Sequence, residues 1–216
     1  MKTLQCTFIA LFFCSVNLLA NEVNDEKYLS TMQKNIDVLY DAKTLADYQT
    51  VINAFERIAG VETKKWEPLY YAAFGYIMMS DMETSLVKKD EYLDLAIIAN
   101  DKAKALAPAE SELLAIEGFI HMMRVAIDPA SRGPKFAGLS MQSLQKAVEL
   151  NNENPRALAL LAQMQYGTAQ FFGSSTEEAC KTGSLAIVKF ETYKSENPLA
   201  PVWGKKMAEG LTKNCQ

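Results

Sequence analysis

The sequence predicts an all-α protein built from helix pairs that stack on one another. Apolar residues recur every three or four positions along most of the chain, a spacing that gathers them on one face of a helix. Pro108 separates two such patterns near the middle of the chain, because the residue before a proline is forced out of the α region. The same unit then returns, with Ala147 and Leu150 repeating the spacing of Ala103 and Leu106.

The N-terminal third predicts three helices. The first spans residues 27–42, and Thr44 then caps a second helix that ends at Gly60. A third helix runs from Trp66 to Ser80, and an insert over residues 81–89 connects it to the next element.

The central helices lie on either side of Pro108. The helix before it begins near Asp90, and the helix after it contains Gly118. A glycine inside a helix costs about 1 kcal/mol relative to alanine. We therefore expect Gly118 to allow a neighbouring helix to approach closely.

The C-terminal half predicts a long insert and three further elements. Residues 128–138, with Pro129, Gly133 and Pro134, predict a loop, and the helix that returns from it covers residues 139–150. Pro155 begins the next helix, which leads to a loop at residues 171–175. Helices over residues 176–194 and 200–213 follow, the last capping the open end of the stack.

The central residues resemble the tetratricopeptide repeat (TPR). The small, proline and glycine positions of that repeat are matched by Ala96, Ala103, Leu106, Pro108 and Gly118. The resemblance covers roughly residues 66–195 and departs from the family in period, because prolines 68, 108, 155 and 198 are 40, 47 and 43 residues apart rather than about 34. It implies one TPR-like domain over residues 21–216, with about four helix pairs and a C-terminal capping helix. The chain also resembles uncharacterised exported bacterial proteins of this type, which implies a compartment but no activity.

Residues 1–20 predict a secretory signal peptide. Lys2 precedes an apolar core at residues 8–13, and Ala20 ends the segment. Cys14 raises the alternative of a lipoprotein, but the bulky Phe13 before it argues against that processing. We therefore expect an exported protein, in the periplasm of a Gram-negative cell.

The charge of the mature chain argues against two classes of partner. Without residues 1–20, Lys and Arg fall from 22 to 21 while Asp and Glu stay at 26, which leaves a net charge of −5. A mildly acidic chain without a basic patch does not predict binding to nucleic acid or to an anionic membrane. No membrane span is expected after the signal peptide.

Cys180 and Cys215 remain after cleavage, and their positions predict a disulfide. An exported chain meets an oxidising environment. Cys180 lies near the start of one predicted helix and Cys215 just beyond the end of the next, so antiparallel packing brings them together. Unpaired thiols are the alternative.

No motif for catalysis or for a cofactor is present, so we predict a protein that is not an enzyme. His121 is the only histidine, and we interpret it as packed and hydrogen-bonded, with a general base as the alternative. One histidine and two bridged cysteines do not predict a zinc site. The methionines at positions 78, 79, 82, 122, 123, 141 and 164 predict gap-filling on helix faces, with Cu(I) binding as the alternative.

The function predicted by the resemblance is a scaffold whose groove binds a peptide or protein segment. The candidate contact residues are polar or aromatic positions late in the chain: Arg132, Lys135, Arg156, Gln163, Phe172 and Trp203. The alternative is a protein that binds a small ligand or a metal, using either the methionines with His121 or a closed pocket under the 128–138 insert.

Overall fold

The computed structural model describes residues 25–215, and this part of the chain is all-helical. The predictions for the signal peptide and for Cys14 lie outside the described residues. A first helix covers residues 25–41, followed by α2 (Leu45–Val61), α3 (Glu67–Met82), α4 (Leu86–Leu106), α5 (Ser111–Ile127), α6 (Pro129–Leu150), α7 (Pro155–Phe172), α8 (Glu177–Thr192) and α9 (Lys205–Lys213). Between residues 25 and 215 no helix is both long and apolar enough to cross a membrane.

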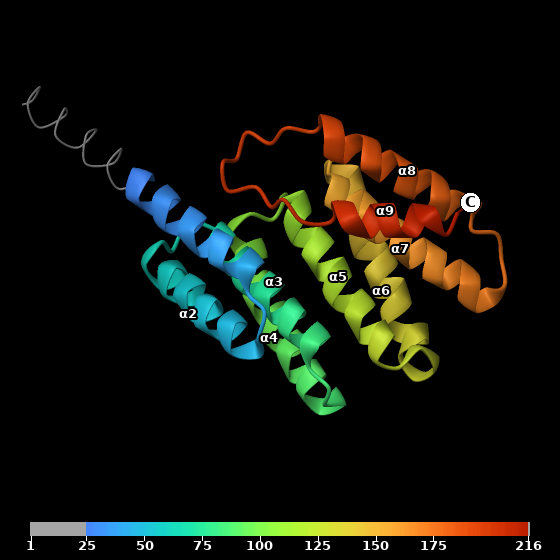
Figure 1. Ribbon diagram of the computed structural model, residues 1–216, viewed down its shortest axis with the longest axis horizontal. Coiled ribbons are helices and arrows are strands. Elements are labelled where there is room, and N and C mark those ends of the chain that lie inside the picture. Colours follow the sequence, from blue (N-terminus) through green and yellow to red (C-terminus); the bar gives the residue numbers. More distant parts are fainter. Residues whose placement is uncertain (1–24, 216) are drawn as a thin grey trace, which may run out of the picture.

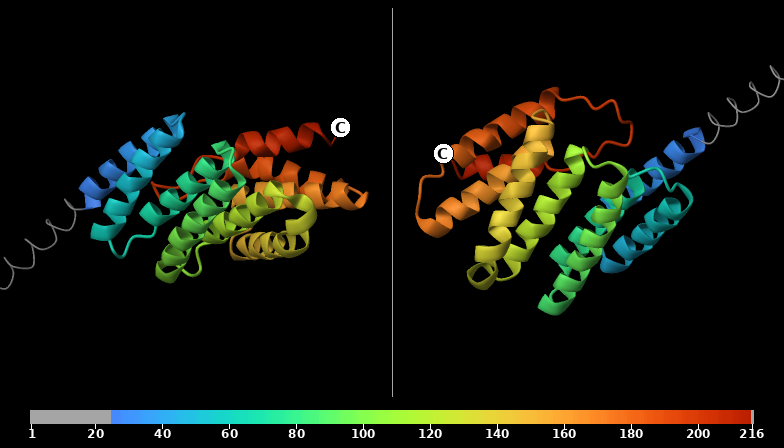
Figure 2. Two further views of the ribbon diagram at one scale, coloured as in Figure 1. Left: turned by 90° about the horizontal axis from the view of Figure 1, so that it is seen from below. Right: turned by 180° about the vertical axis from the view of Figure 1, so that it is seen from behind.

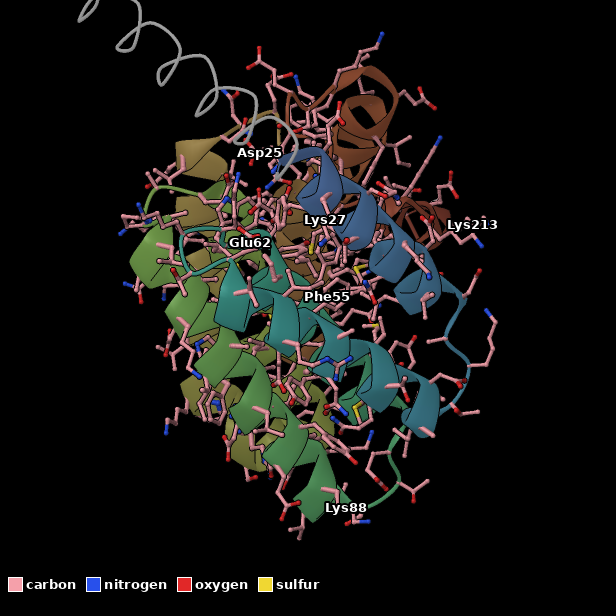
Figure 3. The ribbon with its side chains drawn as sticks, turned by 90° about the vertical axis from the view of Figure 1, so that its left-hand side faces the viewer. Asp25, Lys27, Phe55, Glu62, Lys88 and Lys213 are labelled. Atoms are coloured by element: carbon pink, nitrogen blue, oxygen red, sulfur yellow. A yellow bond between two sulfur atoms is a disulfide. The ribbon has the colours of Figure 1, made fainter. Side chains whose placement is uncertain are left out.

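The helices form four antiparallel pairs in chain order, which confirms the predicted helical-hairpin stack. α3 packs on α4, α5 on α6 and α7 on α8, while α3, α5 and α7 also contact one another in succession. The first helix and α2 form the pair at the N-terminal end, onto which Figure 3 looks. α9 lies against α7 and α8 as the predicted cap (Figure 1).

Local sequence sets most of the helix ends. The Thr44 side chain accepts from the backbone N–H of Asp47, and the Asp47 carboxylate accepts from that of Thr44, so α2 begins with a capping box. Asn154 caps α7 through the N–H groups of Arg156 and Ala157. α7 ends at Gly173, whose φ of 64° is left-handed.

Helix packing explains the central glycine. A Cβ at Gly118 would lie 2.4 Å from Cγ of Leu144 on α6. α5 and α6 therefore approach more closely than an alanine would allow, as the sequence predicted.

Three predicted boundaries before α7 are wrong. Residues 128–138 are not a loop: α6 starts at Pro129 and runs through Pro134, with Asp128 accepting from the N–H of Ser131 as its cap. Gly60 does not end α2, since the helix continues to Val61. The insert after α3 is also shorter than expected, because only residues 83–85 separate α3 from α4.

The segment between α8 and α9, residues 193–204, crosses back over the stack and is called the strap below. It replaces the first turns of the helix predicted over residues 200–213. In Figure 1 it leaves α8, passes toward the N-terminal half and returns to α9, and the rear view in Figure 2 shows the same long connection. Its Leu199 carbonyl accepts a 2.6 Å hydrogen bond from the Tyr71 hydroxyl of α3.

Candidate functional site

The strap covers the face that the first helices of the pairs present. Trp203 of the strap stacks against Phe74 of α3 and Phe119 of α5, with ring centroids 5.0 and 5.6 Å away. The Trp203 indole N–H also donates to the Tyr70 hydroxyl at 2.9 Å. In a TPR-like stack this face would hold the peptide groove. Here the protein's own chain fills it between α3 and α5.

A buried ion pair lies beneath the strap. Arg156 is only 4% exposed, and its Nε and Nη2 donate to the Glu112 carboxylate at 2.9 and 2.6 Å. The Tyr70 hydroxyl lies 3.4 Å from the same carboxylate. Burial raises the pKa of Tyr70 well above its usual value, since a phenolate would lose hydration and face Glu112. This cluster joins α3, α5, α7 and the strap, so its charges are already paired inside the protein.

The candidate ligand site is an apolar cleft of about 670 Å³ on another part of the stack, where the end of α7 stands next to the α5–α6 hairpin. We call it the α5–α7 cleft. Its lining residues are Met122, Met123, Val125 and Ala126 of α5, Pro129, Gly133, Pro134, Ala137 and Gly138 of α6, and Gln163, Met164, Gly167, Thr168, Phe171 and Phe172 of α7. The cleft lies under residues 128–138, where the alternative prediction placed a pocket.

Three glycines of this cleft have open space where a side chain would stand. A Cβ placed at Gly133, Gly138 or Gly167 would meet nothing within 4 Å, whereas one at Gly75, Gly118 or Gly183 would collide with a neighbouring helix. Close packing therefore explains the second group and not the first. Each glycine inside a helix costs about 0.5–1 kcal/mol relative to alanine. Gly133, Gly138 and Gly167 instead leave open space beside the cleft.

Two phenylalanines stand at the end of α7, where it borders the cleft. Phe171 and Phe172 are 64% and 74% exposed and pack edge to face, with ring centroids 5.1 Å apart. Exposing two adjacent aromatic rings to water has an unfavourable free energy, because their apolar surface is not buried. Exposed apolar surface of this kind is typical of binding sites.

The α5–α7 cleft has neutral walls. Its lining contains no Asp, Glu, Lys or Arg, and the polar groups in it are the side chains of Gln163 and Thr168. The Gln163 amide donates to the Met207 carbonyl of α9 at 3.2 Å, which fixes that side chain. Such a site recognises shape and apolar surface rather than charge.

A second hollow, of about 560 Å³, lies between the first helix and α2. Its lining is mixed, with Lys27, Thr31, Asn35, Arg57 and Glu62 beside three apolar side chains and Tyr28. It lacks the continuous apolar wall of the α5–α7 cleft. We therefore take the α5–α7 cleft as the candidate site.

The predicted contact residues fall in two places. Gln163 and Phe172 line the α5–α7 cleft, and Arg132 and Lys135 lie on the same stretch of α6 as Gly133 and Pro134. Arg132 is engaged with Asp90 of α4 at 2.6 and 2.7 Å, and this guanidinium holds the pKa of the Asp90 carboxyl below its usual value. Lys135 is exposed, with its ammonium 5.0 Å from the Phe136 ring.

The other two predicted contact residues, Arg156 and Trp203, lie in the buried cluster beneath the strap. The Arg156 side chain is buried, and Trp203 is half-buried. Their position gives them a part in holding the strap to the stack.

No sequence pattern indicated that the three cleft glycines belong to a site. Nothing in the sequence separates Gly167 from Gly118, because both stand inside a helical pattern. The methionines were recognised as a set, and three of the seven meet in the α5–α7 cleft.

His121 does not belong to this cleft. Its ring stacks on Phe136 at 5.9 Å, and its Nδ1 atom is buried without a hydrogen-bond partner among the described residues. The packed part of the prediction is confirmed, whereas a hydrogen bond at Nδ1 is not found. Burial lowers the pKa of His121 below its usual value.

The predicted disulfide between Cys180 and Cys215 is present, with Cα atoms 5.8 Å apart. It joins the start of α8 to the residues just after α9. A structural disulfide is typical of proteins that fold outside the reducing cytoplasm.

Comparison with known proteins finds similar folds among solved structures. No protein-family model matches the chain, and no curated protein matches it. One of the similar structures is the HusA haemophore from Porphyromonas gingivalis, with 26% sequence identity and a TM-score of 0.77. The likeness covers 88% of this chain and 92% of the haemophore, so it extends over most of the helical stack.

Proposed function

We propose that this protein binds a flat, apolar ring ligand of the porphyrin type in the α5–α7 cleft. The observation that carries the proposal is the set of three helical glycines that open onto one apolar cleft. These glycines cost helix stability and relieve no steric contact. Room for a ligand accounts for them.

The dimensions and chemistry of the cleft suit such a ligand. Its volume of about 670 Å³ falls within the range of about 300–1,000 Å³ that small-molecule sites occupy. The absence of side chains at Gly133, Gly138 and Gly167 leaves space for a ring, and Phe171 and Phe172 offer aromatic faces for stacking. Because no charged residue lines the cleft, carboxylates on the ring would remain in solvent at its mouth.

The similar structure supports the same ligand class. HusA is described as a haemophore, and its likeness covers 88% of this chain. We extend haem or porphyrin binding from that protein to this one as part of the proposal.

We further propose that the protein works as a binder in the periplasm and carries out no catalysis. The disulfide and the haemophore both support export. The TPR-like relationship remains a prediction, and so does a peptide-binding scaffold. A scaffold of this kind would have to use a surface other than the strap-covered face. The residues that favour one are Arg132, Lys135 and Phe172, which lie on α6 and α7 near the cleft.

A titration of the mature protein with protoporphyrin IX and with haemin tests the proposal. Binding is detected by the absorbance of the ring and by quenching of tyrosine and tryptophan fluorescence. The decisive variant is Gly167→Leu, which places a side chain in the open space of the cleft. We expect the affinity to fall more than tenfold, or by more than about 1.4 kcal/mol. The melting temperature should stay the same or rise, because leucine favours a helix by up to about 1 kcal/mol over glycine.

The matched control is Gly60→Leu, since Gly60 also lies in a helix and a Cβ there also meets nothing within 4 Å. This variant should bind like the parent protein. Equal affinity in Gly167→Leu and Gly60→Leu would remove the α5–α7 cleft as the site, and no binding by the parent protein would remove the proposed ligand class.

A further inference from the structure

The first half of α6 has little helix stability of its own. It contains Gly133, Pro134 and Gly138, which disfavour a helix, and Pro134 has no N–H to donate to the carbonyl one turn earlier. All three residues line the α5–α7 cleft. This wall of the cleft therefore depends on contacts with neighbouring helices. One of them is the stack of Phe136 on His121 of α5, with ring centroids 5.9 Å apart.

His121 adjoins the cleft without lining it. Met122 and Met123, which follow it on α5, are lining residues, and so is Ala137, which follows Phe136 on α6. The His121 side chain is half-buried, and its Nδ1 atom is buried without a hydrogen-bond partner among residues 25–215. A neutral imidazole tolerates this, because its proton can stand on Nε2. An imidazolium donates from both nitrogens, so its buried Nδ1–H would lack an acceptor.

Positive charge already surrounds the Phe136 ring. The Arg124 guanidinium of α5 lies 5.6 Å from the ring centre, and the Lys135 ammonium of α6 lies 5.0 Å from it. Asp90 of α4 holds Arg124 in place at 3.3 Å and also binds Arg132 of α6. One cation over an aromatic face is favourable. A protonated imidazole in the stack would add a third cation, which the other two repel.

The other charges near His121 do not offset this repulsion. Burial is the largest influence on the pKa of His121 and lowers it below the usual value of 6.5. Glu117 of α5 and Asp101 of α4 raise this pKa, whereas Arg124 and Lys104 lower it. Both acids already pair with Lys104 of α4. Protonation therefore gives the ring no new, unpaired anion.

We propose that protonation of His121 loosens the first half of α6 from α5 and thereby releases the ring ligand from the α5–α7 cleft. This inference rests on the function proposed above and adds a release step to it. The stack with neutral His121 is the form that binds, so the affinity is full above the pKa of His121 and falls as the pH drops through it. The coupling is reciprocal. A ring that binds the protonated protein tenfold more weakly lowers the pKa of His121 in the complex by about one unit.

Two titrations of the parent protein test the release. The affinity for metal-free protoporphyrin IX is measured at a series of pH values between 7 and 5. The pKa of His121 is measured by NMR with and without the ring, and its signals are unambiguous because it is the only histidine. We expect the affinity to fall by about tenfold or more, which is typical of coupling between two sites. The pKa of His121 should be lower in the complex than in the ligand-free protein.

The matched control is His121→Phe, which keeps a ring that can stack on Phe136 and cannot take up a proton. Its affinity should depend much less on pH than that of the parent protein. The carboxylates of the porphyrin titrate alike in both experiments, so the difference between the two proteins isolates His121. Melting temperatures at pH 7 check that both proteins are folded.

Amide hydrogen exchange measures the structural step without any ligand. In the parent protein, protection of residues 129–138 should fall between pH 7 and pH 5, after correction for the intrinsic exchange rates. Residues 139–150 of the same helix serve as the internal reference and should keep their protection. In His121→Phe both halves of α6 should keep it.

Three results would overturn the inference. If the parent protein and His121→Phe lose affinity alike toward pH 5, the release is wrong, although ring binding in the cleft stands. If residues 129–138 keep their protection while His121 takes up its proton, the loosening of α6 is wrong. If the ring does not bind at pH 7, the proposed function is wrong and the release falls with it.

Discussion

Single residues show where a sequence pattern is ambiguous. Arg156 follows Pro155 at a helix start, and arginine side chains are mostly exposed in proteins. In this structure its guanidinium is buried against Glu112, which lies 44 residues earlier in the chain. The pairing depends on how α5 and α7 stack. Sequence spacing therefore identified Arg156 as notable but could not identify its partner.

His121 makes stability depend on pH in a predictable direction. Burial is the largest cause that lowers its folded-state pKa below the usual value of 6.5, and the nearby Arg124 and Lys104 act in the same direction against Glu117 and Asp101. Between these two pKa values the unfolded chain therefore binds more protons than the folded protein. The free energy of unfolding should fall as the pH is lowered through 6.5 toward the folded-state pKa.

Denaturant unfolding checks this pH dependence. The free energy of unfolding is measured at a series of pH values between 7 and 5 for the parent protein and for His121→Gln. The difference in unfolding free energy between the two proteins should shift against the parent as the pH falls, since only the parent has the histidine. A constant difference across this range would show that His121 titrates alike in both states.

At the scale of elements, the sequence predicted helices well wherever apolar residues follow the helical period. α3, α5 and α7 lie close to their expected ranges, and the turn at residues 107–110 is where Pro108 placed it. The start of α6 was mistaken for a loop because Gly133 and Pro134 disfavour a helix locally. Long-range contacts outweigh that preference, since Arg132 pairs with Asp90 of α4 and Phe136 stacks on His121 of α5.

The two kinds of helical glycine should respond to alanine with opposite signs. In Gly118→Ala the new Cβ would lie 2.4 Å from Leu144 Cγ, so we expect a loss of about 1–3 kcal/mol from overpacking. In Gly167→Ala the Cβ meets nothing within 4 Å, and we expect a gain of up to about 1 kcal/mol. Urea unfolding of both variants measures this. A destabilised Gly167→Ala would mean that the glycine is needed for the fold rather than for room in the cleft.

At the scale of the whole molecule, the strap covers one face of the stack. The helical period predicted a stack, and the stack implied a groove across its first helices. Leu199 of the strap accepts a hydrogen bond from Tyr71 on that face. Trp203 of the strap contacts Tyr70, Phe74 and Phe119 there. The long separation between residues 70 and 203 hid this contact from the sequence. The cleft left open is formed instead by α5, α6 and α7.

The disulfide ties the strap region into the stack. It closes a segment with a sequence separation of 35 residues, from the start of α8 through the strap to the end of α9. On the chain-entropy model this should contribute about 3–4 kcal/mol to stability. Denaturant unfolding of Cys180→Ser/Cys215→Ser should show that loss, and the reduced parent protein should match the variant. A loss below about 1 kcal/mol would mean that packing of α9 alone holds this end of the chain.

The most direct test of the central claim is a methyl NMR titration with metal-free protoporphyrin IX, in protein labelled at the methionine methyl groups. Ring-current shifts fall off within a few ångströms of a porphyrin, so the methyl groups report where the ring lies. If the ring lies in the α5–α7 cleft, we expect large shifts at Met122, Met123 and Met164, and none at Met32, which is buried at the N-terminal end of the stack. Shifts absent from all three cleft methionines, with the ring bound elsewhere or not at all, would contradict the account.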